Sequence, residues 1–584
     1  MRMKRAIIIP VLFLQIAAFA QDLNPTVTVV NDYLGEASGI VKPAQTVNIP
    51  DSVSRFTLNF DYSVFENRRE SSYEFKPYTV QRRWLAGNGS GREEGLLYVK
   101  AGAGYTLSPD LHVVYTPFSG KDFALSVFTG HESYIGNYWN YKFDDITKNG
   151  VTTHVVSKDK SNTALQAGRE GNSTLGTRLR YSWGRAELNA MAAWDNVFSA
   201  IDRGAKFGRL ANSFNLETSL NSIDSELDYN AYLSLRAGVD QYRYASASRI
   251  GATELKFGGR IGTLDAGIHN LSLGADVSMQ FLSGAADAFS GYVALLPRDE
   301  FWLDDWHFDL GLSFGLLFRG DKTLAPMFGE TTHQEMFTRS PQCFFPRIFV
   351  SKGFAGDRFV FDAGITGGEK YMSYWDFVSE HPFLGSQSVE GAMLDNTIEK
   401  LNVYAGIRGA LSDNFHLALK GGYRMVANDL MWKAVDDGNG QPDMQPHMGY
   451  CSYNQAYSAL DLEWNPEPFS AKVGVEAAYN KLLSNDSFFA PAALRGRSEL
   501  TYHWGSRLRA GVRAGWQTSR KAVMGADDAK IPGYCDLGLF GEFQWRRNLG
   551  FWLEASNLLN QTVMTDPFIA RRGVSVTAGV IFKL

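Results

Sequence analysis

The feature that most constrains this chain is an alternation of apolar and polar residues at every second position, repeated in segments of about 10 to 13 residues. Two clear segments run from Leu271 to Phe281 and from Trp306 to Phe318. Successive side chains of a strand point to opposite faces, so each segment has one apolar and one polar face. Soluble strands average about five or six residues, whereas membrane-crossing strands need about 9 to 11. The pattern therefore predicts strands that cross a membrane.

The connections between these segments fall into two length classes. Short turns at one end and long loops at the other are typical of outer-membrane barrels. About eleven long loops predict about 22 strands, since each long loop closes one hairpin. We expect an all-β fold, a transmembrane antiparallel β-barrel of about 22 strands with short periplasmic turns and long extracellular loops; the alternative is a large soluble β-protein. The short connections are expected at 108–110, 184–185, 412–414, 465–468 and 505–506, and the long ones near 133–173, 320–345, 368–396, 426–447 and 518–533.

The composition excludes several other classes. A mean hydropathy of −0.20 argues against a bundle of membrane helices. The formal charge of −5 means that the chain as a whole has no positive potential that would attract nucleic acid. A hydrophobic content of 45% is too high for a disordered chain. The three cysteines exclude a disulfide scaffold, and one loop disulfide among Cys343, Cys451 and Cys535 is conceivable but cannot be assigned.

The first residues predict export from the cytoplasm. A basic start is followed by an apolar run that ends in Ala18-Phe19-Ala20, which indicates a secretory signal peptide over 1–20. The run is too short for the alternative, a membrane anchor helix. Residues 21–53 contain three prolines and indicate an extended periplasmic segment. The barrel is expected over 54–584, with its first strand at Arg55–Tyr62 and its last strand running to the end of the chain.

The end of the chain resembles TonB-dependent receptors. Residues 550–560 read Gly-Phe-Trp-Leu-Glu-Ala-Ser-Asn-Leu-Leu-Asn, and Arg572-Gly573 leads into the final strand; this is similar to the last hairpin of that family. The sequence as a whole resembles members of this family from Bacteroidota, including the sugar-importing branch. The resemblance implies an outer-membrane barrel for small-solute uptake. The family also has an N-terminal plug domain, for which the space before Arg55 is too short, so we expect a barrel without the plug and without its energised import.

Motifs for chemistry are scarce. The sequence contains no H-E-x-x-H, no G-x-S-x-G and no P-loop. His307 and His416 fall on faces expected to line the lumen, where a Ser/His lipase-like site is a minor alternative to ordinary polar wall residues. The Asp- and Asn-rich loop 436–443 hints at calcium and the Met-, His- and Cys-containing stretch 444–451 at copper, but turn-forming loops collect such residues for conformational reasons. We expect no enzyme, no bound metal and no cofactor.

Charged residues on the predicted lumen faces are the candidate functional set. Both signs are present, so no sharp ion selectivity is expected. One interpretation is cross-strand ion pairing that stiffens a wide barrel. The other is contact with a solute or with a partner that fills the lumen. The candidates are Arg236, Arg319, Lys420, Arg424, Arg509, Arg513, Asp276, Asp309, Glu476 and Glu542.

Two functions follow from these expectations. The first is a plugless or partner-gated outer-membrane channel for small solutes, whose identity the sequence does not indicate. The second is a barrel subunit of an outer-membrane complex that does not transport. In either case the surroundings are outer-membrane lipid, and a periplasmic or surface lipoprotein is a conceivable partner. The expected lack of a plug favours the second function over the first.

Overall fold

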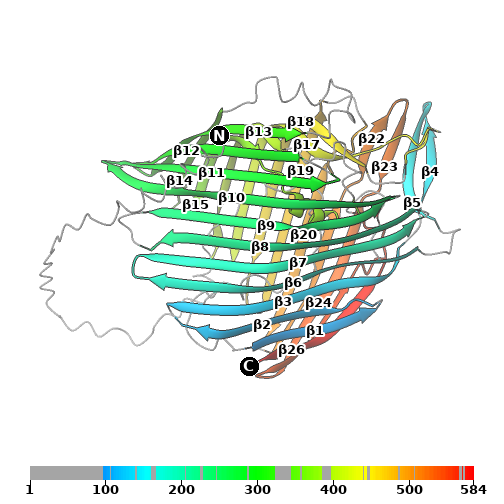
Figure 1. Ribbon diagram of the computed structural model, residues 1–584, viewed down its shortest axis with the longest axis horizontal. Coiled ribbons are helices and arrows are strands. Elements are labelled where there is room, and N and C mark those ends of the chain that lie inside the picture. The colour runs from blue at the N-terminus through cyan, green and yellow to red at the C-terminus, as the bar shows by residue number, and fades with distance from the viewer. Residues whose placement is uncertain are drawn as a thin grey trace, which may run out of the picture. The chain divides into compact units, whose positions relative to one another are not determined.

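The strands of the chain close into one ring. The computed structural model describes residues 97–584 apart from 106, 121, 139–140, 160–165, 204, 224–227, 245, 286–287, 322–343, 356–357, 385–395, 439, 444–446, 484–486, 506, 565–568 and 570–572. Within these residues 22 strands form a single antiparallel sheet (Figure 1). The predicted all-β barrel of about 22 strands is therefore confirmed.

The strands of the ring are β1 (Leu97–Tyr105), β2 (Asp110–Ser119), β3 (Phe123–Tyr138), β6 (Gln166–Trp183), β7 (Ala186–Arg203), β8 (Ala205–Ser222), β9 (Tyr229–Tyr244), β10 (Ser246–Ala266), β11 (His269–Gly284), β12 (Ala288–Leu303), β13 (Trp306–Asp321), β14 (Phe344–Phe354), β15 (Phe359–Lys370), β16 (Thr397–Ser412), β17 (Phe415–Lys433), β18 (His447–Trp464), β19 (Phe469–Leu482), β20 (Leu494–Trp504), β21 (Leu508–Gln517), β24 (Tyr534–Arg546), β25 (Leu549–Ser556) and β26 (Ser575–Lys583). Each pairs with the next in this order.

The ring closes where the last strand meets the first. β26 pairs with β1 over eight residue pairs, from Tyr98↔Lys583 to Tyr105↔Val576. Gly102 and Gly579 face each other in this register, and a Cβ atom built on Gly579 would lie 2.0 Å from the carbonyl oxygen of Ala101. Only a residue without a side chain fits at that approach. Closure leaves no exposed sheet edge, as expected for a strand at the end of a barrel chain.

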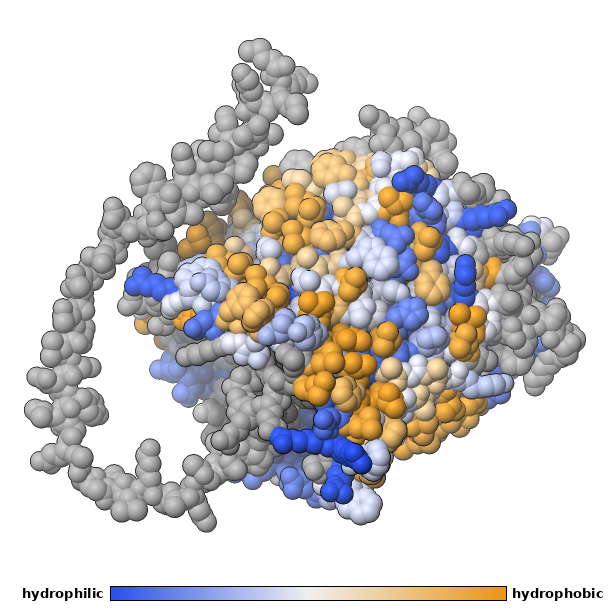
Figure 2. Space-filling model, turned by 60° about the horizontal axis from the view of Figure 1, so that its bottom comes forward, coloured by the Kyte–Doolittle hydropathy of each residue, from blue (hydrophilic) through white to orange (hydrophobic). Residues whose placement is uncertain are grey.

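The two faces of the ring follow the alternation in the sequence. Apolar side chains at one set of positions are exposed on the outside, such as Leu273 at 57% and Leu316 at 56%. Side chains at the alternate positions point inward and pack against their neighbours, and Gln280 and Asp309 are buried. Figure 2 shows apolar side chains gathered on the outer face that it views. This sorting is what a strand needs when lipid lies on one side and a polar lumen on the other.

The two ends of the ring differ. We call the end that holds the 184–185, 412–414, 465–468 and 505–506 connections the turn end, and the opposite end the loop end. The expectation that 108–110 belongs with the short turns is wrong, because β1 and β2 are joined at the loop end, where Leu107 bridges to Ile135. The loop end is also uneven, since β7 to β10 run for 16 to 21 residues and are joined there by single residues.

A small second sheet forms from two loops at the loop end. The β3–β6 loop supplies β4 (Tyr141–Lys148) and β5 (Val151–Lys158), and the β21–β24 loop supplies β22 (Arg520–Met524) and β23 (Asp527–Ile531). β5 and β23 pair in parallel, and Asp527 accepts a hydrogen bond from the amide of Thr152. Two loops that are far apart in sequence are thereby tied together.

A continuous apolar cluster crosses the barrel. It includes Val197 and Ala211 on the inner face of β7 and β8, and Met448 and Tyr450 on β18. β7 and β18 lie half a ring apart, so the cluster reaches from one wall to the opposite one. Its centre comes from the β15–β16 loop, which contains the helix α5 (Tyr374–Glu380). The other members come from β4, β5, β9 to β12, β17, β22, β23 and the loops that follow β17, β19 and β25.

Several expectations concern residues outside the described part of the chain. These are the signal peptide over 1–20, the periplasmic segment over 21–53, the barrel boundary at 54 with its first strand at Arg55–Tyr62, and Cys343. The lack of a plug domain also rests on those residues and stays a prediction. Among the described residues, no helix has both the length and the apolar character needed to cross a bilayer.

Candidate functional site

The candidate site is the contact between the barrel wall and the first part of the β15–β16 loop. Residues 371–384, which we call the inner loop, are mostly buried. They contain Met372, Tyr374, Trp375, Phe377 and Val378, each exposed by 2% or less. Burial of such side chains stabilises by about 1.5–3 kcal/mol each, so the apolar run accounts for the inward course of this loop.

The start of α5 is bound by side chains of the wall. Ser373 is the N-cap: its hydroxyl accepts from the amide of Asp376 at 3.1 Å and donates to Oε2 of Glu254 at 2.6 Å. Oε1 of Glu254 accepts from the amide of Trp375 at 3.1 Å. Oε1 of Gln280 accepts from the amide of Tyr374 at 3.0 Å. Amides in the first turn of a helix have no partner within the helix, and here β10 and β11 supply the acceptors.

A buried ion pair forms the second attachment. Arg209 on β8 and Asp240 on β9 both have fully buried side chains, with Nε and Oδ1 3.2 Å apart. The other carboxylate oxygen of Asp240 accepts from the Tyr374 hydroxyl at 2.7 Å, and Arg209 donates to the carbonyl oxygen of His381 at 2.8 Å. Burial, and then the charge of Asp240, raise the pKa of Tyr374 well above its usual value, so this hydroxyl remains a donor. The ion pair thus holds both ends of α5.

The rest of the inner loop is attached in the same way. The hydroxyl of Ser199 on β7 donates to the carbonyl oxygen of Pro382. The ring of Phe383 packs edge-on against Tyr138 of β3, with ring centroids 5.6 Å apart. The ring of His381 packs edge-on against Trp432 of β17. Attachments on β3, β7 to β11 and β17 therefore hold the inner loop inside the ring.

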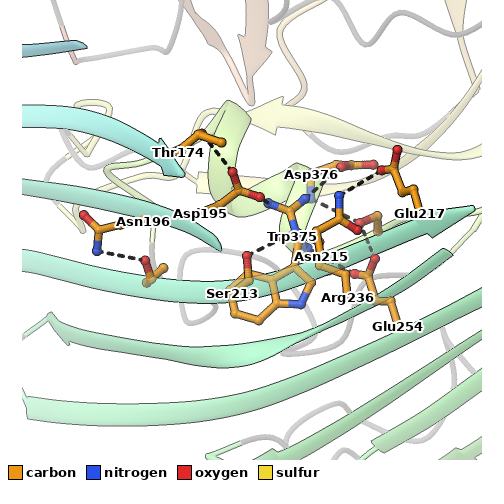
Figure 3. Close-up of polar contacts among 12 residues, drawn as sticks. Thr174, Asp195, Asn196, Ser213, Asn215, Glu217, Arg236, Glu254, Trp375 and Asp376 are labelled. Carbon is orange, nitrogen blue, oxygen red and sulfur yellow. Dashed lines mark hydrogen bonds and ion pairs between the residues drawn. The ribbon is translucent and has the colours of Figure 1, made fainter. Parts of the chain in front are cut away.

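Of the ten candidate residues, Arg236 is the one that the described contacts join to the inner loop. Its guanidinium lies between Asp195 at 3.5 Å and Asp376 at 3.6 Å, and its Nε donates to the hydroxyl of Ser213 at 3.2 Å (Figure 3). It also lies 5.7 Å from the ring of Trp375. The side chain of Asp376 is 59% exposed, so this pair lies at the open side of α5.

Most of the other candidates contact side chains of the wall. Arg509 pairs with Glu499, and Arg513 pairs with Glu554. Such pairs favour the interpretation that the charges stiffen the barrel. The side chain of Arg319 lies outside the described part. The remaining contacts are Lys420 over the ring of Tyr404, Arg424 with Gln455, Asp276 with Tyr232, Asp309 with Arg298, Glu476 with Arg495, and Glu542 opposite Arg509 in the sheet register.

The other residues singled out from the sequence have wall or loop contacts as well. His307 lies between Glu300 at 2.9 Å and the Ser351 hydroxyl at 3.5 Å, and the Arg298 guanidinium also binds Glu300. In the loop 436–443, Asp436 accepts from the amides of Gly438 and Gly440, as turn chemistry requires. Cys451 and Cys535 are not joined to each other by a disulfide.

The residues that hold the inner loop were not among the sequence candidates. Four of them occupy inward positions of the alternating pattern: Arg209, Asp240, Glu254 and Gln280. Nothing in their own segments distinguishes them from other polar wall residues. One signal was available in the loop itself. The run Tyr371–Val378 carries six aromatic or large apolar side chains in eight positions, which is unusual for a loop expected to face water.

Comparisons with known proteins identify the fold. No protein-family model and no curated protein sequence matches the chain. Among solved structures, the FrpB iron transporter from Neisseria meningitidis superposes with a TM-score of 0.60 at 10% identity, over 86% of this chain and 83% of that one. The ferric enterobactin receptor PfeA from Pseudomonas aeruginosa gives a TM-score of 0.57 at 12% identity, over 84% and 80%. The copper transporter OprC gives 0.58 at 13% identity, over 84% and 80%. The chain thus has the barrel fold of TonB-dependent receptors.

Proposed function

We propose that the protein is an outer-membrane barrel through which small solutes pass, and that its inner loop closes the lumen from within. The observation that carries this proposal is the attachment of α5 to Glu254, Gln280 and Asp240 on the inner wall. The outer-membrane location and the transport role are supported by likeness to barrels described as an iron transporter, a siderophore receptor and a copper transporter.

The attachments are of a kind that can be broken and remade. The polar attachments are hydrogen bonds to wall side chains, and each contributes about 0.5–1.5 kcal/mol, or about 1.5–3 kcal/mol where one group is charged. They add to the stabilisation from burial of the apolar run. Solute passage requires the inner loop to leave this position, because the apolar cluster otherwise spans the ring. The closed arrangement is therefore the resting state, and a solute or a partner that binds the open arrangement would shift the population.

Swelling of proteoliposomes tests the proposal. The full chain is reconstituted and challenged with neutral sugars of increasing size. We expect slow swelling for the wild type and fast swelling for the double variant Glu254→Ala/Gln280→Ala, which removes the acceptors of the first turn of α5. Glu217→Ala is the matched control, because Glu217 accepts from Asn215 and forms no hydrogen bond or ion pair with the inner loop among the described residues. No swelling with the double variant, when it is folded, would reject the passage.

A second candidate function is a barrel subunit of an outer-membrane complex. The observation that favours it is the small sheet at the loop end, where the apolar side chains of Ile146, Val151 and Val523 are 47%, 39% and 61% exposed. Exposed apolar side chains on such a sheet suit contact with another protein, such as a surface lipoprotein. Purification in mild detergent followed by mass spectrometry tests this function. Stoichiometric recovery of a partner that Val523→Lys removes would support it, and recovery of the barrel alone would count against it.

A further inference from the structure

A pocket lies in the inner wall between α5 and the turn end. It has a volume of about 170 Å³ and is lined by residues of β9 to β14. On β9 its members are Asn230 and Tyr232, near the turn end, whereas Asp240 on the same strand binds the inner loop. The pocket is thus distinct from the attachments of α5 and lies further along the lumen.

Two glycines on the inner face leave space in the wall at this point. Gly274 and Gly311 occupy inward positions of β11 and β13. A Cβ atom on Gly274 would lie 3.3 Å from Cβ of Leu296, so a larger residue there would fill the pocket. A Cβ atom on Gly311 would lie 3.6 Å from Cβ and Cδ of Arg347. The aliphatic part of Arg347 therefore lies beside Gly311, within van der Waals distance of the position that a Cβ atom at 311 would occupy.

Three guanidinium groups line the pocket. Arg260 is paired with Asp228, and Arg298 is held by Asp309 at 2.5 Å and by Glu300 at 3.3 Å. These carboxylates fix the two groups and balance their charge. Arg347 is exposed and has no ion-pair partner in the described part of the chain, so it is the one of the three guanidinium groups that no carboxylate of the wall holds. The fourth charged group, Asp276, accepts from the Tyr232 hydroxyl at 2.9 Å.

At least one hydrogen-bond donor in the pocket has no acceptor in the described part of the wall. Nε of Arg260 is buried and has no hydrogen-bond partner among the described residues. Buried polar groups in folded proteins nearly always have a partner, and such an exception calls for an explanation. The forked donors of arginine match the geometry of carboxylate and phosphate oxygens. An oxyanion in the pocket would pair with the guanidinium of Arg347, and Arg260 lines the same pocket.

We propose that this pocket binds the oxyanion, carboxylate or phosphate, of a small organic solute. The inference rests on the proposed passage and names the class of solute that uses it. The volume limits the body of the solute, since a protein cavity of about 150 Å³ holds one benzene molecule. The site therefore suits an acid or phosphate ester with a body of about one ring.

Equilibrium dialysis with the purified full chain in detergent tests this site. The probes are benzoate, phenyl phosphate and, as the neutral control, benzyl alcohol. We expect at least one anion to bind saturably and at least tenfold more tightly than benzyl alcohol, since a charge-assisted hydrogen bond accounts for a factor of this size. The stronger of the two anions shows whether the solute is an acid or a phosphate ester. Equal binding of the alcohol, or no saturable anion binding, would overturn the proposal.

Variants connect the binding to the pocket. Arg347→Gln is expected to weaken anion binding at least tenfold, and Gly274→Leu to abolish it by filling the pocket. Arg358→Gln removes the same charge from an exposed position between β14 and β15 and is expected to leave binding unchanged. If Arg347→Gln and Arg358→Gln behave alike, the site is wrong. Dialysis does not depend on passage, so a barrel that binds the anion without swelling would reject the passage alone.

Discussion

The Ser373 hydroxyl donates a 2.6 Å hydrogen bond to the carboxylate of Glu254, a residue that lies 119 positions earlier in the chain. Ser373 caps the short helix of the inner loop, and Glu254 belongs to the wall strand β10. This contact joins a loop to the inner face of the barrel at a depth of eight residues from the loop end of β10. The lumen is therefore filled by its own loop and not by wall side chains alone.

The first prediction concerns the amides of the inner loop. The amides of Tyr374 and Trp375 donate to wall side chains, so they are expected to exchange slowly with solvent deuterium. In Glu254→Ala/Gln280→Ala their acceptors are gone, and exchange of peptides covering 371–384 should rise at least tenfold. Glu217→Ala should leave exchange unchanged. Hydrogen exchange with mass spectrometry makes the measurement, and equal rates in all three proteins would show that these bonds do not hold the loop.

The second prediction concerns the buried ion pair. Arg209→Met leaves the carboxylate of Asp240 buried without its charged partner, which costs about 3–5 kcal/mol. The double variant Arg209→Met/Asp240→Leu removes both charges and should recover a large part of this loss. Denaturant unfolding of the reconstituted barrel gives the free energies. A double variant that is no more stable than the single one would mean that Arg209 acts through some other contact.

The third prediction concerns tyrosine ionisation. A pKa raised in the folded state means that stability is present below the ordinary tyrosine pKa near 10 and is lost as the pH rises above it. Burial raises the pKa of both Tyr371 and Tyr374. In the folded protein at pH 11, Tyr374→Phe should therefore leave the phenolate absorbance at 295 nm unchanged, whereas after unfolding it should remove the signal of one tyrosine. A loss of signal already in the folded protein would contradict the buried position of this ring.

The fourth prediction concerns closure of the ring. A side chain at Gly579 would meet the backbone of Ala101 and Gly102, so Gly579→Val should prevent β26 from pairing with β1. Gly368→Val is the matched control, because a Cβ atom there meets no atom within 4 Å. Folded barrels migrate faster than unfolded chains on gels run without heating. We expect the fast band to disappear for Gly579→Val and to persist for Gly368→Val; the opposite result would contradict the register of closure.

The barrel could be predicted from the sequence alone because every strand has the same two environments on its two faces. Lipid on one side and a polar lumen on the other impose the same alternation on each segment. The position of a residue such as Leu273 or Asp276 in this alternation therefore indicates which face of the strand it lies on. The sites of hairpin connections were less certain. The turn after β1 reads like the short turns elsewhere, and its end of the barrel becomes clear only from the pairing of Leu107 with Ile135.

The inner loop could not be derived in the same way. Its position depends on contacts such as Trp375 with Glu254, between residues that no local pattern connects. Alternation selected Arg236 as a lumen residue, and the structure places it beside Asp376 of α5. It equally selected Arg509 and Arg513, whose partners lie on other wall strands, β20 and β25. A period of two specifies which face a side chain is on, and it carries no information about what folds back against that face.

The most direct test of the account is the current through single barrels in a planar lipid bilayer, recorded for the wild type, for Glu254→Ala/Gln280→Ala and for Glu217→Ala. All three proteins are first checked for folding by their migration without heating. The account predicts a wild type and a Glu217→Ala control that conduct little, and a double variant that carries a large, steady current because its inner loop is released. A large steady current through the wild type that the double variant does not increase would contradict closure by the inner loop.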